Sequence, residues 1–527
     1  MKILKAIVRS LVWLGSWLLG LVLAAPFVVA LAFEVVGWKG MRFGISFALF
    51  VLVIGTLTVF AGETMERFAT WRRRQSRGFV AHVVSNAMDI WSLVAGLSGF
   101  FFFVGPGPWS DAVLVLAIVC LAVWMALTLE GRQGVSVTGV GVSTLPQRLG
   151  SSAVIVVGIA GVVAVLVAML AMANGYAETL RRTGSLDTVI VLRGGSASEV
   201  NSGIGHDNAL VIAQAPGIAK DDQGRPIASP ELVVAANLPI KGGNAEEDFG
   251  SVQLRGVGDE AWKLRTNAKI IAGRRFTPGL RELVAGKGAQ RQFTGLDVDR
   301  DIKLGNQTWK VVGVFESGDA MQSELWADAD VVGPTYRPAS ANSSSSVFVR
   351  LTGADAYETF KAAITSDPRL QVDVDTTLNY FSKQSEGTSK AITAIGIVVG
   401  AIMAIGAIFG ALNTMFAAVA TRAREIATLR AIGFRGLPVV IAIMLETMLL
   451  ALIGGTLGGL IAWLLFNGFS ASTLAAGTTG QLTFQLEVAP RVLWTGLKWA
   501  LAIGFIGGIY PALRAARLPV TTALREQ

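Results

Sequence analysis

Catalytic and metal-binding residue types are scarce in this sequence of 527 residues. It contains one cysteine, Cys120, and two histidines, His82 and His206, which stand far apart. A metal site needs several such ligands at short spacings, so the sequence indicates none. It also lacks a G-x-S-x-G nucleophile elbow and a G-x-x-x-x-G-K-[ST] phosphate loop. The segment GKGAQRQFTG, from Gly286, contains glycines and a lysine, but not in the order of a phosphate loop. We therefore predict that this chain is not an enzyme, has no catalytic residue and binds no cofactor itself.

Charge is scarce as well: 16% of the residues are charged, 52% are apolar, and the mean hydropathy is +0.55. A bilayer core about 30 Å thick is crossed by about 20 helical residues. Eight apolar segments are about that long: 11–33, 43–61, 89–105, 111–129, 152–173, 391–418, 438–467 and 491–513. The sequence therefore predicts an α-helical polytopic membrane protein with eight membrane-spanning helices.

Lysine and arginine are distributed unevenly over the predicted loops. Basic residues of short loops stay in the cytoplasm, and with the N-terminus inside, the cytoplasmic segments hold most of them, including the cluster from Arg72 to Arg74. This predicts a multi-pass protein of the cell (inner) membrane with both termini in the cytoplasm. Anionic membrane lipid then accounts for the net charge of +8, so we expect membrane lipid, and no nucleic acid, as a partner.

The long polar segment 174–390 lies between the fifth and sixth predicted helices, outside the cytoplasm. It contains five strand-like runs: DTVIVLRGG, ELVVAANL, SVQLRGVG, DIKLGNQTWKVVGVFE and SSVFVRL. The fourth has Gly305-Asn306 at its centre and predicts a β-hairpin. A helical run near residue 354 completes the pattern of an α+β extracytoplasmic domain. Helical stretches at 173–186 and 376–390 predict two stalks that join this domain to the membrane helices.

A basic amphipathic stretch, TRAREIATLRAIGFRG at 421–436, lies between the sixth and seventh predicted helices. On a helix, Ile426, Leu429 and Ile432 form an apolar stripe, and Gly433 is placed to end the helix. Four charged residues flank the stripe: Arg422, Arg424, Glu425 and Arg430. Such a helix can lie on lipid headgroups or dock into a groove of a cytoplasmic partner, and amphipathicity alone leaves both open.

Two charged residues lie within predicted membrane helices. Glu446 is about two turns from the cytoplasmic end, within reach of Arg430 or Arg435, which favours a structural ion pair. Lys498 is about two turns from the outer end, where a lysine side chain can extend to the membrane interface. Neither shares a helix face with a second acidic group, so we expect no proton relay.

The C-terminal part of the sequence carries recognisable motifs. The pattern R-x-x-E-I-x-x-L-R-A-x-G runs from Arg422 to Gly433, a Gly-rich run follows Glu446, and a P-x-x-R-A-A-R tail begins at Pro511. In the outer domain, AGRRFTPGLRELVAGKGAQRQFTGLDVDRDIKLGNQTWKVVGVFES begins at Ala272. These stretches resemble the FtsX/MacB-like permeases of ABC transporters (type VII). The resemblance covers about 145–527 and does not account for the first four predicted helices.

The resemblance implies that 421–436 is a coupling helix that engages an ATPase subunit. The residues implied in this contact are Arg422, Arg424, Glu425, Ile426, Leu429, Arg430 and Gly433. ATP and Mg²⁺ would then be bound by a separate ABC ATPase chain. One coupling helix in each chain implies two permease copies, expected as a homodimer. A periplasmic adaptor or substrate protein is a further expected partner.

Four parts make up the expected domain organisation. They are an N-terminal four-helix extension (1–135), a cytoplasmic linker with the fifth helix (136–173), the extracytoplasmic domain with its stalks (174–390), and a three-helix module with the coupling helix (391–527). The extension contains no second E-I-x-x-L-R motif, so it is not a duplicated half of the module.

The resemblance implies a permease subunit that couples ATP hydrolysis by its partner to movements of the extracytoplasmic domain. Its substrate would be an amphiphile, such as a lipoprotein, peptide, lipid or drug-like molecule, at the outer leaflet or in the periplasm. The alternative is a subunit that transports nothing and regulates a cell-wall hydrolase by mechanotransmission. A membrane enzyme or sensor is the third function class. Stimulation of the ATPase by a substrate would favour the first function, and binding of a periplasmic hydrolase would favour the second.

The predicted topology can be tested by cysteine labelling of intact spheroplasts with an impermeant thiol reagent. We expect cysteines at Gly107, Ser251 and Gly477 to react, because these positions are predicted to lie outside. Cysteines at Gln75 and Gly436 should be protected, and labelling at Gln75 would overturn the count of eight helices.

Overall fold

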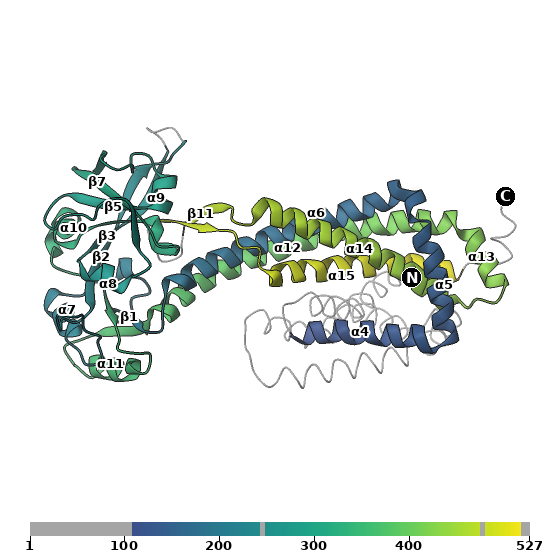
Figure 1. Ribbon diagram of the computed structural model, residues 1–527, viewed down its shortest axis with the longest axis horizontal. Coiled ribbons are helices and arrows are strands. Elements are labelled where there is room, and N and C mark those ends of the chain that lie inside the picture. The colour runs from purple at the N-terminus through teal and green to yellow at the C-terminus, as the bar shows by residue number, and fades with distance from the viewer. Residues whose placement is uncertain (1–107, 243–247, 475–479, 518–527) are drawn as a thin grey trace, which may run out of the picture. The chain divides into compact units, whose positions relative to one another are not determined.

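The computed structural model of the chain describes residues 108–242, 248–474 and 480–517 (Figure 1). The predicted membrane helices 11–33, 43–61 and 89–105 lie outside the described residues. The chain divides into two compact units, Met1–Ser136 and Val137–Gln527. Of the first unit, the structure describes helix α4 (Pro108–Leu127) and the beginning of α5 (Leu129–Ser143). The elements described below belong to the second unit.

Four long helices of the second unit are apolar enough to cross a membrane: α6 (Leu149–Thr183), α12 (Thr377–Thr421), α14 (Gly436–Phe466) and α15 (Pro490–Ala516). They coincide with the last four predicted membrane helices. Helices α4 and α5 pass the same test only together, as a pair bent by 101°. The described residues therefore hold four candidate membrane spans, or five with the bent pair, and the total of eight stays a prediction.

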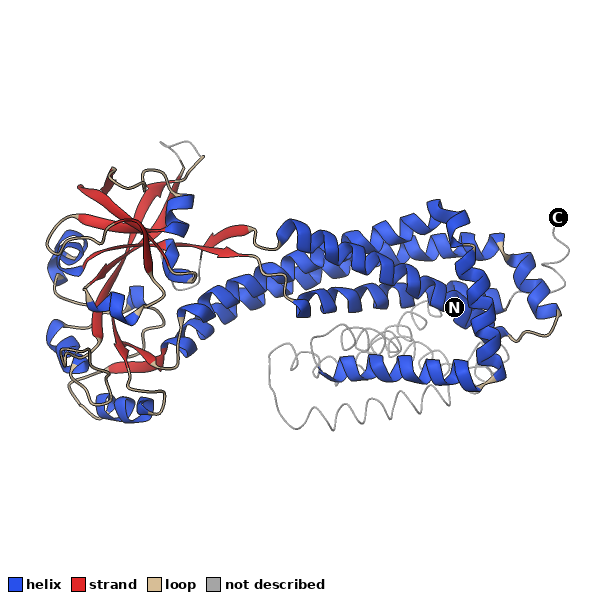
Figure 2. Ribbon diagram, in the orientation of Figure 1, coloured by secondary structure: helices blue, strands red, loops and turns tan. Residues whose placement is uncertain are grey.

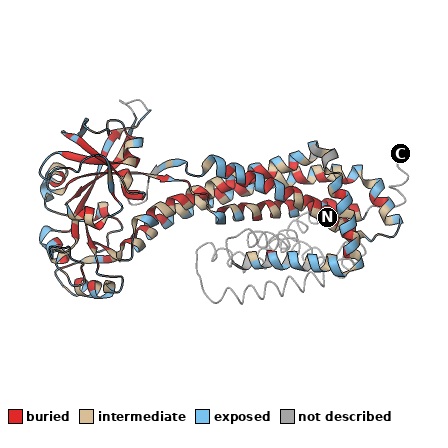
Figure 3. Ribbon diagram, viewed as in Figure 1, coloured by how far each residue is buried: buried red, intermediate tan, exposed pale blue. Residues whose placement is uncertain are grey.

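Small residues allow these helices to pack closely. A Cβ at Gly458 of α14 would overlap the backbone of Ala160 on α6, and one at Gly508 of α15 would overlap the side chain of Thr447 on α14. Because lipid offers little hydrophobic force between helices, close contacts of this kind hold a membrane bundle together. Large apolar side chains remain exposed along the outer faces of the bundle, as contact with lipid requires (Figure 3).

The sheet domain, between α6 and α12, contains as far as it is described a sheet of ten strands in the order β10-β1-β9-β2-β3-β8-β5-β7-β4, with β6 paired to β7 (Figure 2). The strands are β1 (Thr188–Arg193), β2 (Ala228–Pro239), β3 (Phe249–Val257), β4 (Lys269–Gly273), β5 (Glu282–Gly286), β6 (Asp301–Leu304), β7 (Gln307–Glu316), β8 (Glu324–Asp328), β9 (Ser346–Arg350) and β10 (Val372–Thr376). The first half of β2 pairs with β9 and the second half with β3, so one strand joins the two halves of the sheet.

Short helices cover this sheet: α7 (His206–Ala213), α8 (Glu260–Leu264), α9 (Lys287–Gln292), α10 (Ala329–Tyr336) and α11 (Ala356–Thr365). One hydrophobic core surrounds Phe360 of α11, and another surrounds Trp309 of β7. The predicted α+β domain is confirmed: the five strand-like runs fall on β1, β2, β3, β6 with β7, and β9. The predicted hairpin is β6–β7, in which Asp301 lies opposite Lys310.

Helices α6 and α12 continue beyond their apolar runs into the sheet domain, as the sequence predicts for the two stalks (Figure 1). Helix α6 leads into β1, and α12 follows β10. Strands β1 and β10 are antiparallel neighbours, with Val189 opposite Thr376. The backbone N–H of Ser185 donates a hydrogen bond to the hydroxyl of Thr377 (2.8 Å) and links the two junctions. The stalks therefore enter the sheet at adjacent strands.

A second hairpin, for which the sequence predicts no strand, connects α14 to α15. It is formed by β11 (Ser470–Leu474) and β12 (Gln481–Gln485). Phe484 packs edge to face on Tyr176 of α6, with ring centroids 5.5 Å apart. The N–H of Thr483 donates to the hydroxyl of Ser323, beside β8 (2.9 Å). The hairpin thus ties the α14–α15 connection to both a stalk and the sheet domain.

A buried arginine, Arg255 of β3, lies at the centre of an ion network in the sheet domain. Its five N–H donors bond to the carboxylates of Glu199, Glu231 and Glu324 over distances of 2.7 to 3.1 Å. Arg265 makes two further bonds to Glu231. Burial opposes the charge of Arg255, but the carboxylates outweigh it and raise the pKa of the guanidinium well above its usual value. Burial removes the hydration of each charged side chain in the network. Each therefore depends on its partners of opposite charge for stabilisation.

We expect Arg255→Met to lower the free energy of unfolding by about 3–5 kcal/mol, because it leaves the buried carboxylates of Glu199 and Glu324 without a paired cation. Thermal unfolding of the purified full-length protein measures the effect. Arg300→Met, at an exposed position of the same domain, is the matched control and should change stability by less than about 0.5 kcal/mol. Equal unfolding midpoints for the two variants would contradict this role of the network.

Candidate functional site

The amphipathic segment forms a short helix, α13 (Ala423–Ala431), between α12 and α14. It ends before Gly433, as predicted, and this glycine has a φ of +108°, which other residues rarely adopt. The N–H of Gly433 bonds to the carbonyl of Arg430 (3.2 Å), and that of Phe434 bonds to the carbonyl of Leu429 (3.1 Å). This is the Schellman arrangement, which satisfies the last carbonyls of a helix. The chain then enters α14 at Gly436, so α13 is held at both ends.

The apolar stripe of α13 is divided between an inner and an outer face. Ile426 is only 7% exposed and packs within the chain, whereas Ile432 is 71% exposed. Leu429 is half-buried between them, and Arg424 and Glu425 are exposed. Ile426 therefore holds α13 against the bundle, and the surface open to a partner consists of Ile432 and its charged neighbours.

Arg422, at the junction of α12 and α13, points into the protein. Its Nη1 donates to Glu446 of α14 (2.9 Å), and its Nη2 donates to the carbonyl of Gly141 (3.2 Å) and to the hydroxyl of Thr144. The side chains of Arg422 and Glu446 are 12% and 7% exposed. This ion pair joins the end of α12 to α14 and to the end of α5. Arg422 thus anchors the junction of α12 and α13 from inside and has little surface to offer a partner.

The sequence-based expectation of Arg430 or Arg435 as the partner of Glu446 is therefore replaced by Arg422. The ion pair itself is as expected. Arg430 lies in the last turn of α13 and Arg435 follows this helix, so both are closer to Glu446 in sequence than Arg422, which precedes α13. The fold brings Arg422 within 2.9 Å of Glu446, and a count of helical turns along α14 does not reveal this contact.

Lys498 of α15 is 1% exposed, so the prediction that its side chain extends to the outer interface is wrong. Its neighbours on α15 explain the burial. A Cβ at Gly496 would meet Val167 of α6, and Ala500 lies against Gly455 of α14. This part of α15 is thus enclosed by other helices of the bundle, and Lys498 is enclosed with it.

Two features that sequence reasoning missed bear on how the site works. The β11–β12 hairpin is one, because Thr483 and Phe484 contact Ser323 and Tyr176, which are far away along the chain. The Arg255 network is the other. Its one sequence signal is an arginine inside the strand-like run SVQLRGVG, where a charged residue in a buried strand requires a partner.

Two protein-family models match the chain. The MacB-like periplasmic core domain matches residues 152–367, which hold α6 and most of the sheet domain. The FtsX-like permease C-terminal model matches residues 397–520, which hold most of α12, then α13, α14, the second hairpin and α15.

Several curated proteins are similar to this chain. The macrolide export ATP-binding/permease protein MacB of Escherichia coli is 26% identical over 392 residues, 71% of this chain and 57% of MacB. The pyoverdine export ATP-binding/permease protein PvdT of Pseudomonas syringae is 25% identical over 313 residues, 55% of this chain and 46% of PvdT. The uncharacterized ABC transporter permease YknZ of Bacillus subtilis is 24% identical over 396 residues, 71% of this chain and 93% of YknZ. The chain thus spans about half the length of the MacB and PvdT relatives.

Two solved structures are similar to part of this chain. The periplasmic region of MacB from Actinobacillus actinomycetemcomitans has a TM-score of 0.29 and 12% identity, covering 39% of this chain and 95% of that one. The extracellular domain of the noncanonic ABC-type transporter YknZ from Gram-positive bacteria has a TM-score of 0.26 and 16% identity. The match covers 33% of this chain and 88% of that one. On the two family models and the MacB and YknZ relatives, the chain belongs to the FtsX/MacB-like family of ABC transporter permeases.

Proposed function

We propose that this chain converts ATP hydrolysis by a separate ATPase chain into movement of its sheet domain. The observation that carries the proposal is α12, an uninterrupted helix of 45 residues from Thr377, beside β10, to Thr421, beside α13. At about 1.5 Å per residue it is about 68 Å long, roughly twice the thickness of a bilayer core. A displacement of α13 therefore reaches the sheet through one continuous element.

Close packing makes this element stiff. Gly396 and Gly400 of α12 lie close to Met169 and Leu166 of α6, so the two helices pack tightly within their membrane-spanning parts. At the other end, the Arg422–Glu446 ion pair links the start of α13 to α14. Movement of α13 would thus displace α12 and α14 together, and α12 would carry it to β10.

The proposed partners are inferred from the exposed surface of α13 and Ile432. An ATPase groove would receive Ile432, with Arg424 and Glu425 at its rim, and ATP and Mg²⁺ would be bound by that ATPase. We propose that this chain itself contributes no catalytic residue. Each chain supplies one α13, so the working unit would contain two permease copies as a homodimer.

Transport of an amphiphile is the function we favour. MacB and PvdT are named for the export of a macrolide and of pyoverdine, which supports transport over the regulation of a cell-wall hydrolase. The proposed substrate is a lipoprotein, peptide, lipid or drug-like amphiphile that meets the sheet domain at the outer leaflet or in the periplasm.

Docking through α13 can be tested with Ile432→Asp. We expect the variant to weaken ATPase binding about 10- to 100-fold, because a charge would replace the apolar centre of the contact. Co-purification of the ATPase with the full-length permease measures the loss. Leu210→Asp, which makes the same kind of change at an exposed position on α7, is the matched control and should bind normally. Undiminished co-purification with Ile432→Asp would rule out the coupling role.

A further inference from the structure

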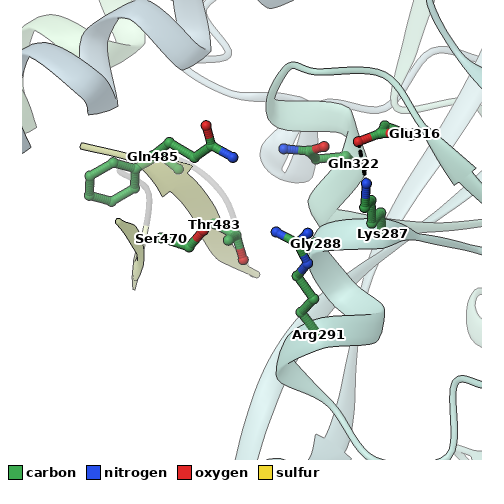
Figure 4. A pocket seen from close by; sticks show the side chains of 9 residues that line it. Lys287, Gly288, Arg291, Glu316, Gln322, Ser470, Thr483 and Gln485 are labelled. Atoms are coloured by element: carbon green, nitrogen blue, oxygen red, sulfur yellow. Dashed lines mark hydrogen bonds and ion pairs between the residues drawn. The ribbon is translucent and has the colours of Figure 1, made fainter. Parts of the chain in front are cut away.

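A cavity of about 110 Å³ lies between α9 of the sheet domain and the β11–β12 hairpin (Figure 4). One wall begins with the Gly286-Lys287-Gly288 segment, whose glycines and lysine do not fit a nucleotide phosphate loop. A Cβ at Gly286 would overlap the carbonyl of Gln322, and one at Gly288 would press on it. The glycines therefore let the start of α9 lie against Gln322 and shape the cavity. Since one water needs about 10–15 Å³, the space suits a polar group of several atoms.

Three of the polar side chains that line this cavity, those of Arg291, Gln322 and Gln485, can donate hydrogen bonds that the described residues leave unused. Among the described residues, no carboxylate pairs with Arg291, and the amides of Gln322 and Gln485 have no hydrogen-bond partner. Figure 4 shows these two amides directed toward each other from opposite walls. The arginine remains charged at any physiological pH and can only donate hydrogen bonds. The walls thus offer donors that an anionic group would satisfy.

The charges in the cavity favour an anion with a single negative charge. Lys287 is paired with Glu316 at 2.6 Å, and Arg291 adds a second cation. Two cations and one carboxylate leave one net positive charge. A carboxylate in the wall also discriminates against more highly charged anions, because it repels them.

Hydrogen bonds from Thr483, which lines the cavity, hold its two walls together. The N–H of Thr483 donates to Ser323, and the hydroxyl of Thr483 donates to the side-chain carbonyl of Gln292 at the end of α9 (3.2 Å). The hairpin wall is also fixed to the stalk, because a Cβ at Gly175 of α6 would overlap the carbonyl oxygen of Gln485. The two walls of the cavity are therefore held together before any ligand binds.

The cavity lies close to the end of the predicted membrane span. Gly175 is two residues beyond the end of the apolar run 152–173, and it contacts the hairpin beside Gln485. A lipid headgroup at the outer membrane surface can therefore reach the cavity. We propose that the cavity binds the phosphodiester monoanion of a lipid or other amphiphile. This inference rests on the proposed function, because that function supplies an amphiphile at this surface, and it adds the chemical group that the cavity would bind.

The test is calorimetric titration of the full-length chain in dodecyl maltoside, a detergent without phosphate. The probes are dihexanoyl phosphatidylglycerol, below its micellar concentration, and inorganic phosphate. We expect Arg291→Gln to weaken binding of the phosphodiester about tenfold, because it removes a charge-assisted donor. Glu316→Gln should strengthen binding, because it frees Lys287 and removes the repelling carboxylate.

Arg281→Gln, an exposed arginine at the other end of β5, is the matched control and should bind like the unaltered protein. The unfolding midpoints of Arg291→Gln and Glu316→Gln should stay within about 2 °C of the midpoint of the unaltered protein, so that a change in folding does not account for a change in binding.

Binding of the lipid analogue alone identifies a headgroup site, and equal binding of inorganic phosphate identifies a site for free phosphate. Absence of binding by either probe, or weaker binding in Glu316→Gln, overturns the proposal. The ATPase is not needed here, so failure of this site and failure of ATP coupling are separate results.

Discussion

A helix cannot break inside a bilayer without leaving backbone N–H and C=O groups unpaired, and this constraint governs the whole module. It requires α6 and α12 to remain helical across the lipid. Both helices then continue without a break to β1 and β10, so the membrane bundle and the sheet domain share two continuous elements. The short helix α13 at the other end of α12 is placed where a partner can act on them. The proposed coupling between α13 and the sheet domain would therefore need no intermediate hinge.

In the proposed mechanism, three local structures would limit the flexibility of the path between α13 and the sheet domain. The Arg422–Glu446 ion pair fixes the start of α13 to α14, and Ile426 packs below it. The β11–β12 hairpin ties the α14–α15 connection to the sheet domain through Thr483 and Phe484. Within the domain, Arg255 and its three carboxylates join β3 to β2 and β8. Each contact joins segments that would otherwise move separately.

Local patterns in the sequence were enough to predict the four long helices α6, α12, α14 and α15, the β6–β7 hairpin and the end of α13 at Gly433. Long apolar runs, a Gly-Asn turn and a glycine after an amphipathic stretch each determine a structure through neighbouring residues. The partner of Glu446, the burial of Lys498 and of Ile426, and the second hairpin could not be predicted. Each depends on a contact with a distant segment, as when Arg422 bonds to Thr144, 278 positions away. The family motif also includes Arg422 and Ile426 without distinguishing anchoring residues from docking residues.

Transmission through the stalks can be measured by double electron–electron resonance between nitroxides at Glu358→Cys in two permease copies, with Cys120 replaced by serine. Glu358 is exposed on α11 of the sheet domain. With the ATPase bound, a non-hydrolysable ATP analogue should shift the distance distribution. Flexible Gly/Ser insertions after Glu178 in α6 and after Gly387 in α12 should abolish the shift while the ATPase still co-purifies, because flexible linkers do not transmit a tilt. A shift that persists with both insertions would contradict transmission through the stalks.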